Sequence, residues 1–400
     1  MKILLVDYSG HPFQVQLSRA LARRGHSVRH VFSASFQTPH GRLSREDGDP
    51  PTFEIASVST KQAFAKASFV KRRAQEIEIG HALADQVRAF APDVVLSSNV
   101  PLDAQRGLQR ATHDAGARFV FWLQDIYSEA ITRVVTRKFP VIGHLVARIY
   151  DRLEYRLLRR SEGVVAISPD FLPILAARGV SPSRTHVVEN WAPLDELPIY
   201  PRDNDWAAAN MPADALRFVY SGTIGYKHDP MLLLQLAEEL GEGVSVLVFS
   251  QGEAADALAR AAADKGVANL SVRPWVPFGD LPRMLGGADV LVAMIEPEAG
   301  IYSVPSKILT YLAAGRPILA SMPSANLAAR NITGADAGMV VEPGDRAGMV
   351  AAARELAASA ERRRAMGDNA RQYAKRTFDI DAIADRFETI LMPQGTENQE

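Results

Sequence analysis

Three stretches of the chain place side chains that can bind a phosphate or a hydroxyl where a loop meets a regular element. The first is Pro305, Ser306 and Lys307, which directly precede a short apolar run. A serine caps the first N–H groups of a helix, a proline stiffens its entry, and the helix dipole attracts an anion. We therefore expect Ser306 and Lys307 to hold a phosphate or diphosphate. An ordinary capped helix without a ligand is the alternative interpretation.

The second stretch is a glycine turn that follows an expected strand at residues 216–220. Gly222 and Gly225 allow backbone N–H groups to approach a ligand closely, and Lys227 can neutralise a phosphate. Such a turn also occurs for packing reasons alone. Two phosphate-type loops in one domain, however, suit a nucleotide diphosphate.

The third stretch is the pair Gln124 and Asp125, which ends a hydrophobic strand at residues 119–123. Polar residues at the carboxyl end of a buried strand face a ligand crevice, so both are candidates for positioning a sugar or an acceptor hydroxyl. The alternative is that Asp125 caps the next helix.

The elements that must position these residues alternate between strand and helix along the whole chain. Residues 3–6 form an apolar run, and a turn with Gly10 leads from it into a helix, as in a βαβ unit. A second alternating series begins at residue 216, after a proline-rich, acidic linker at 192–214. We therefore predict an α/β protein with two tandem Rossmann-like, doubly wound domains facing across a cleft.

The composition is that of a globular protein with 400 residues, 47% hydrophobic residues and no cysteine. This length predicts two domains, and the lack of cysteine fits a reducing compartment. The start of the chain indicates a first strand rather than a signal peptide, and no apolar run is long enough to span a bilayer. The net charge of −1 and the absence of recurring aromatic-basic interleaving argue against nucleic-acid binding.

The net charge is distributed unevenly. Residues 1–200 contain 26 Lys and Arg against 20 Asp and Glu, and residues 133–160 contain eight basic residues against two acids. In this stretch one i, i+4 line is apolar and the adjacent line is basic. Such a helix can lie on an anionic membrane surface, or it can bury its apolar line in the core, and both can hold at once. The expected membrane contacts are Arg133, Arg137, Lys138 and Phe139.

Taken together, these motifs resemble the family-4 retaining glycosyltransferases of the GT-B fold. The resemblance rests on the Gly10 turn, residues 124–129 (QDIYSE), 165–168 (VAIS), 188–191 (VENW), Gly222 with Lys227, and the Pro-Ser-Lys to Ala-Gly-Arg-Pro segment at 305–317. It covers nearly the whole chain. Within the family, the chain resembles the branch that builds O-antigen, capsule and colanic-acid repeats, including N-acetyl-L-fucosamine transferases.

The resemblance implies which part of the chain binds each substrate. Residues 1–195 would form the acceptor-binding domain and residues 196–377 the nucleotide-sugar-binding domain. Residues 378–392 would form a helix that returns to the first domain, and residues 393–400 a tail.

The resemblance also implies roles for single residues. Lys227 would neutralise the donor phosphate and act in catalysis, with Ser306 and Lys307 around the diphosphate. Thr223 occupies the slot of a family arginine, and Tyr302 and Thr310 occupy those of two family glutamates, so Glu296 or Glu298 would face the sugar instead. His11 would contact the donor phosphate or the acceptor. The donor-binding set is therefore Gly10, Gly222, Thr223, Lys227, Glu298, Tyr302, Ser306, Lys307 and Thr310, and the acceptor-binding set is His11, Gln124 and Asp125.

The expected activity is transfer of a sugar from a UDP-linked donor to a lipid-linked saccharide, on undecaprenyl diphosphate, in surface polysaccharide synthesis. Cations and a helix N-terminus would neutralise the leaving diphosphate, so no metal cofactor is expected. The acidic pattern Asp203-Asn204-Asp205 lies in the linker and is interpreted as a solvated turn. Retention would follow a same-face route in which Asp125 orients the acceptor.

The enzyme would be cytoplasmic and peripherally attached to the inner face of the membrane. Two alternatives are a nucleotide-sugar epimerase and a non-catalytic nucleotide-sugar-binding partner of another transferase.

Overall fold

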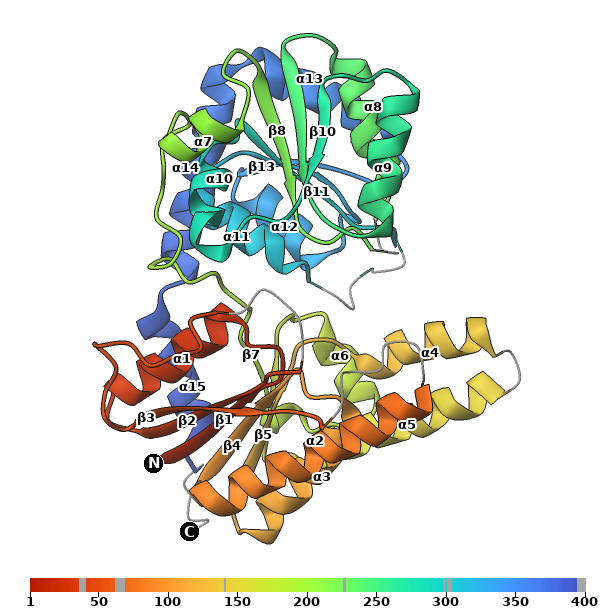
Figure 1. The fold of residues 1–400 in the computed structure, drawn as a ribbon. Coiled ribbons are helices and arrows are strands. Elements are labelled where there is room, and N and C mark those ends of the chain that lie inside the picture. The colour runs from red at the N-terminus through yellow and green to blue at the C-terminus, as the bar shows by residue number, and fades with distance from the viewer. Residues whose placement is uncertain are drawn as a thin grey trace. The chain divides into compact units, whose positions relative to one another are not determined.

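The computed structural model describes residues 1–35, 41–61, 69–139, 142–225, 228–297, 300 and 304–393. Within this part, the chain divides into two compact units. The first comprises Met1–Glu189 together with Ile380–Glu400, and the second comprises Asn190–Asp379. Figure 1 shows an α/β sheet with helices packed against it in each unit.

The first unit contains a seven-stranded parallel sheet in the order β3-β2-β1-β4-β5-β6-β7. Its strands are β1 (Lys2–Asp7), β2 (Ser27–Ser33), β3 (Phe53–Val58), β4 (Val94–Ser98), β5 (Arg118–Leu123), β6 (Gly163–Ala166) and β7 (Thr185–Val187). Its helices are α1 (Pro12–Arg23), α2 (Phe69–Phe90), α3 (Leu102–Asp114), α4 (Tyr127–Lys138), α5 (Ile142–Arg160), α6 (Phe171–Ala177) and α15 (Ile380–Leu391).

Strands buried on both faces explain the apolar runs of the sequence. Ile3, Leu4, Leu5 and Val6 of β1 are fully buried, as a central strand between two helical layers requires. β3 was not expected, because only its first and last residues, Phe53 and Val58, are buried and because it follows a polar loop. Its position at the sheet edge explains that weaker signal.

The last helix belongs to the first unit, as predicted. α15 packs on α1, and Phe387 lies 4.7 Å from the Trp122 ring, centroid to centroid. Arg24 donates hydrogen bonds to Asp385 and, at 2.7 Å, to Glu388. Glu388 also contacts His26 at 2.7 Å. An apolar contact and a small charged network therefore hold the helix.

The second unit contains a six-stranded parallel sheet in the order β10-β9-β8-β11-β12-β13. Its strands are β8 (Leu216–Ser221), β9 (Val244–Phe249), β10 (Leu270–Arg273), β11 (Val290–Met294), β12 (Ile318–Ser321) and β13 (Gly338–Val341). Its helices are α7 (Asp205–Asn210), α8 (Met231–Leu240), α9 (Glu253–Asp264), α10 (Leu281–Gly286), α11 (Ser306–Ala314), α12 (Leu327–Gly334), α13 (Arg346–Ala358) and α14 (Ala360–Thr377).

The predicted linker at residues 192–214 is in fact packed and partly helical. Asn204 accepts a hydrogen bond from the Ala207 N–H at 3.1 Å and so caps α7. Asp203 lies 2.7 Å from Arg202 and 3.4 Å from Arg217, which is 1% exposed. The two acids, Asp203 and Asp205, are exposed as expected, and the structure adds that Asn204 between them is a buried helix cap.

Candidate functional site

In the second sheet, the candidate phosphate loops lie where the strand order reverses. β9 and β10 extend from one side of β8, and β12 and β13 extend from the far side of its neighbour β11. Such a switch point opens a crevice at the carboxyl ends of the two central strands. Gly222 follows the end of β8 there, so the fold places the predicted glycine turn at the position where ligands bind.

Two tyrosine hydroxyls hold the glycine turn. The Tyr311 hydroxyl accepts a hydrogen bond from the Ser221 N–H at 2.9 Å, and the Tyr220 hydroxyl donates to the Thr223 carbonyl at 2.9 Å. Gly222 has a φ of 130°, which L side chains rarely adopt, and its N–H donates to the Phe249 carbonyl at 3.0 Å. The turn is therefore fixed before any ligand arrives.

Lys307 reaches from α11 to this turn. Its Nζ lies 3.7 Å from the centre of the Tyr220 ring, and a Cβ added to Gly222 would lie 3.1 Å from that nitrogen. The side chain as a whole is partly exposed, but Nζ itself is sealed and has no hydrogen-bond partner among the described residues. Burial lowers the pKa of Lys307 from 10.5 to about 7. A buried cation that lacks an anion is therefore the main electrostatic feature of the site.

The start of α11 differs from the prediction in one detail. The helix begins at Ser306, its N-cap is Pro305, and no side chain of the described residues caps it. The Ser306 side chain is exposed instead. The first N–H groups thus remain available to a ligand, which strengthens the anion-binding interpretation. Thr310 follows one turn later and is partly buried.

Gly315 adopts a left-handed conformation at φ 65° and ends α11, and β12 resumes at Ile318. Three predicted donor-site residues, Lys227, Glu298 and Tyr302, lie outside the described residues.

In the first sheet the strand order reverses between β1 and β4, and the Gly10 turn lies there. Gly10 has a φ of 72°. The Asp7 carboxylate is fully buried and accepts hydrogen bonds from the N–H groups of Ser9, at 3.1 Å, and His11. A buried acid therefore shapes the turn that presents His11.

The His11 ring is held from both strands of this switch point. Its Nδ1 lies 3.4 Å from Asp7 Oδ1 and 3.2 Å from Asn99 Nδ2. Asn99 directly follows β4 and has a positive φ of 57°. Sequence reasoning missed Asn99, although a polar residue at the end of a buried strand is the signal that identified Gln124.

Gln124 and Asp125 follow β5, the neighbour of β4, so they lie at the same sheet edge as His11 and Asn99. Gln124 is buried and Asp125 partly exposed. The fold therefore gathers all three predicted acceptor-binding residues at one edge.

Asp125 is not the cap of α4, contrary to the alternative considered above. The helix begins at Tyr127, and the N–H groups of Tyr127 and Ser128 each donate at 2.8 Å to the carboxylate of Glu154 on α5. Glu154 is fully buried, and burial raises its pKa to about 7 against the opposing effect of these hydrogen bonds.

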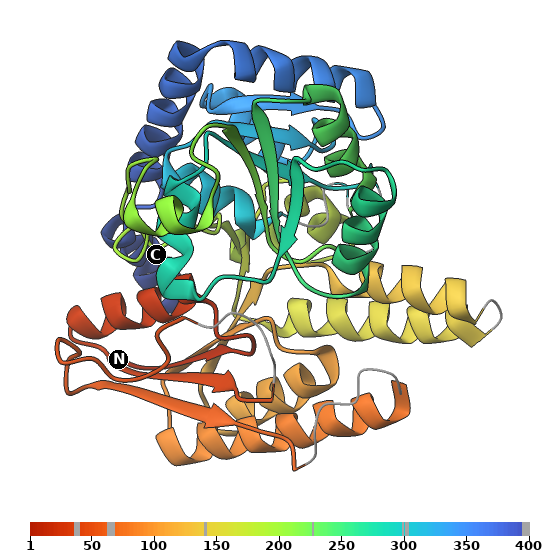
Figure 2. The same ribbon diagram turned by 45° about the horizontal axis from the view of Figure 1, so that its top comes forward.

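α4 and α5 form an antiparallel hairpin that extends beyond the sheet in both views (Figures 1 and 2). Gly143 permits the close approach of the two helices, because a Cβ there would overlap the Val135 carbonyl. Of the predicted membrane contacts, Arg133, Arg137 and Phe139 are exposed, and the side chain of Lys138 lies outside the description. Large apolar side chains are also exposed on the hairpin, namely Val134, Phe139, Ile142, Leu145 and Ile149.

The apolar line of α5 thus changes character along the helix. Leu145 is 61% exposed, whereas Leu157 is 3% exposed and packs in the core. The end of α5 near Leu157 therefore buries its apolar line in the core, whereas the end near Leu145 leaves it exposed.

Two further observations concern the described ranges only. No group of three or more His, Asp and Glu side chains in them is placed to hold a metal ion. None of their helices combines the length and the apolar character needed to cross a membrane.

Comparison with protein families gives matches over most of the chain. Residues 11–191 match the glycosyl transferase 4-like domain, and residues 215–359 match the glycosyl transferases group 1 domain. The two matched segments cover the second sheet and all strands of the first sheet except β1, and Gly10 lies just before the first segment. No curated protein sequence matches the chain significantly.

Several solved structures share the fold. Sucrose-phosphate synthase from Thermosynechococcus elongatus is 16% identical with a TM-score of 0.73, and 98% of each chain is covered. Anabaena HepE, solved with UDP and glucose, is 14% identical with a TM-score of 0.70, over 98% of this chain and 99% of that one. The lipopolysaccharide outer core galactosyltransferase WaaB is 14% identical with a TM-score of 0.57, over 98% and 99%.

Proposed function

Because the chain belongs to the group 1 glycosyltransferases and has the GT-B fold, we propose that it moves a sugar from UDP to a lipid-linked saccharide with retention of configuration. The single observation that carries the donor assignment is the sealed Lys307 ammonium beside the Gly222 turn. A diphosphate would supply the missing negative charge. HepE, which shares the fold, was solved with UDP and with UDP-glucose, and this supports UDP as the nucleotide.

The donor diphosphate would lie between the Gly222 turn and the start of α11. The uncapped N–H groups at Ser306 would bind one phosphate and Lys307 would neutralise the other. Thr223 and Thr310 would line the same crevice. Lys227, Glu298 and Tyr302 complete the proposed donor set. With this charge compensation the leaving group needs no metal ion.

The acceptor would lie at the carboxyl edge of the first sheet. The acceptor hydroxyl would bond to Asp125 and Gln124, with His11 held ready by Asp7 and Asn99. In the reaction, the bond from the anomeric carbon to the UDP oxygen breaks, and the bond to the acceptor oxygen forms on the same face. The acceptor proton passes to the departing phosphate oxygen. Asp125 positions the acceptor and forms no covalent bond.

We further propose that the acceptor is carried on undecaprenyl diphosphate and that the enzyme builds surface polysaccharide at the inner face of the membrane. Exposed apolar and basic side chains on the α4–α5 hairpin support this placement. WaaB, which acts on lipopolysaccharide outer core, shares the fold.

A panel of nucleotide sugars tests the proposal. Thermal shift would identify the donor, and transfer to a lipid-linked saccharide would then be followed by mass spectrometry with the chosen donor. We expect one UDP-sugar to stabilise the protein and to glycosylate the lipid acceptor. Binding without transfer or donor hydrolysis would support a non-catalytic partner, and interconversion of two nucleotide sugars would support an epimerase.

A further inference from the structure

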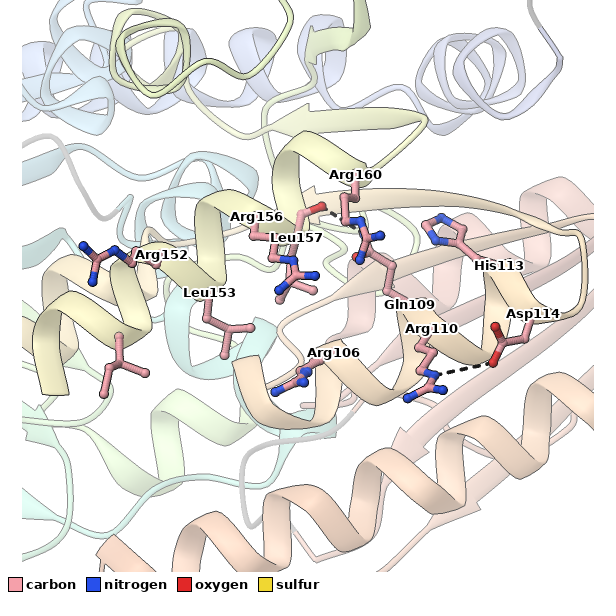
Figure 3. Close-up of a pocket in the computed structure, with 11 residues that line it drawn as sticks. Arg106, Gln109, Arg110, His113, Asp114, Arg152, Leu153, Arg156, Leu157 and Arg160 are labelled. Atoms are coloured by element: carbon pink, nitrogen blue, oxygen red, sulfur yellow. Dashed lines mark hydrogen bonds and ion pairs between the residues drawn. The ribbon is translucent and has the colours of Figure 1, made fainter.

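A groove on the first unit, away from its switch point, is lined by arginines. It has a volume of about 540 Å³ and lies between α3 and α5. α3 contributes Arg106 and Arg110, and α5 contributes Arg152, Arg156 and Arg160, so each helix places one arginine per turn along the groove. Figure 3 shows Leu153 pointing from α5 toward α3, with arginines of both helices around it.

The charge in this groove is poorly compensated. Among the described residues, Asp114 is the one acid that lines it, and Asp114 lies 3.7 Å from Arg110. Within the described ranges, no carboxylate comes within 4.0 Å of Arg106, Arg152, Arg156 or Arg160. Several arginines elsewhere in this unit do have a carboxylate partner, such as Arg19 with Asp49 and Arg24 with Glu388.

Like charges four residues apart on a helix repel each other, and two such rows facing one groove add to that repulsion. The arrangement therefore favours an anionic ligand. A guanidinium group binds a phosphate through two parallel hydrogen bonds, which makes arginine suited to phosphate recognition.

The apolar floor of the groove indicates that the phosphate ligand also has a hydrocarbon part. Leu153 and Leu157 form it, and Gln109 there already donates to the Leu157 carbonyl at 2.9 Å. The apolar line continues along α5 through Ile149, 52% exposed, to Leu145 on the hairpin. A phosphate bound among the arginines would thus have hydrocarbon surface beside it.

This combination fits a phospholipid better than a nucleic acid. Single-stranded nucleic acids stack their bases on aromatic side chains, and among the described residues no Phe, Tyr or Trp lines the groove. A neighbouring groove between α2 and α3 shares Arg106 and Arg110 but also contains Asp103, which lies 3.4 Å from Arg73. The α3–α5 groove therefore has the clearer excess of positive charge.

We propose that the α3–α5 groove binds the phosphate headgroup of an anionic phospholipid while the apolar end of α5 enters the membrane interface. The proposal deepens the membrane placement above and rests on it, but it concerns residues that take no part in donor binding. The enzyme would then recognise the membrane by headgroup charge as well as by hydrophobic insertion.

The test is sedimentation of the full chain with vesicles made of equal parts phosphatidylglycerol and phosphatidylcholine. The groove variant carries Arg106→Gln, Arg152→Gln and Arg156→Gln. The control variant carries Arg23→Gln, Arg260→Gln and Arg364→Gln, which are exposed arginines outside the groove. Both variants lose three positive charges, so a general effect of net charge would be equal in the two.

We expect the groove variant to bind these vesicles about a hundredfold more weakly than wild type and the control variant less than about threefold more weakly. Vesicles of phosphatidylcholine alone should bind all three proteins weakly. Unchanged melting temperatures would confirm that the exposed substitutions preserve the fold, and UDP binding should be equal in all three.

Equal losses in the two variants, or wild-type binding by the groove variant, would overturn the proposal. Binding of a single-stranded RNA oligonucleotide at least as tightly as the vesicles would also overturn it, because it would identify a nucleic-acid site. A protein that fails to bind UDP but still shows the vesicle pattern would refute the proposed donor site alone.

Discussion

Replacing Lys307 by methionine should stabilise the protein and weaken its binding of the donor. No described residue places an anion against the buried ammonium, and burial lowers the pKa of Lys307 from 10.5 to about 7. At 1.36 kcal/mol per unit, this drop corresponds to at most about 5 kcal/mol of unfavourable free energy when the lysine is charged. Methionine fills similar space without a charge but loses the contact with the Tyr220 ring, worth about 2 kcal/mol.

The pH dependence of this effect has a definite sign. Between pH 7 and 10.5 the folded state binds fewer protons at Lys307 than the unfolded state, so wild-type stability rises with pH across that window. Below pH 7 the full penalty is present. The advantage of Lys307→Met should therefore be about 2–3 kcal/mol at pH 6 and should shrink as the pH rises from 7 toward 10.5.

Thermal melts and calorimetric titration with UDP measure both consequences. At pH 6 we expect the melting temperature to rise by several degrees while UDP binds about tenfold to a hundredfold more weakly, since a charged hydrogen bond contributes about 1.5–3 kcal/mol. Lys265→Met in the same unit is the control, because Lys265 is exposed and paired with Glu238. A destabilised Lys307 variant, or a stabilised one with normal UDP affinity, would refute the reasoning.

Three further predictions follow from single contacts. Gly222→Ala should weaken UDP binding and lower stability by about 1–2 kcal/mol, because its φ of 130° strains alanine and the new methyl meets Lys307; unchanged UDP titrations would contradict this. The pKa of Glu154 is about 7 in the folded state and 4.5 in its ordinary state, so wild-type stability should fall by at most about 3 kcal/mol between pH 4.5 and 7. Thermal melts of Glu154→Gln should show a smaller fall over this range. An equal dependence on pH in the two proteins would contradict this prediction. Arg24→Ala should lower hydrogen-exchange protection in α15 by about 1–2 kcal/mol, with the second unit as internal control; full protection of α15 would show that apolar packing alone holds it.

The fold class was predictable because local pattern and tertiary position agree. Central strands such as β1 and β9 are buried on both faces, and this is what a continuous apolar run indicates. The edge strand β3 lacks that run and was missed. The cap of α4 was missed for another reason, since Glu154 reaches it from 26 residues along the chain and no local spacing connects the two.

The residue types of the candidate site could be predicted from the sequence, but the burial and contacts of their side chains could not. Gly222 and Lys307 were identified from loop chemistry, 85 positions apart. That the Lys307 ammonium is sealed against the Tyr220 ring follows only from the fold of the second sheet. The arginine groove was likewise beyond local analysis, because Arg106 and Arg110 reach α5 only through the packing of α3 on it.

The most direct test of the account is calorimetry of UDP binding at pH 8 in two buffers with different heats of ionisation. Lys307 is mostly neutral at this pH in the free protein, since its pKa is about 7, and the diphosphate should restore its proton. We expect UDP to bind with uptake of about one proton, and Lys307→Met to bind weakly without uptake. Absence of UDP binding, or equal proton uptake by both proteins, would contradict the assignment of Lys307 as the cation that holds the donor diphosphate.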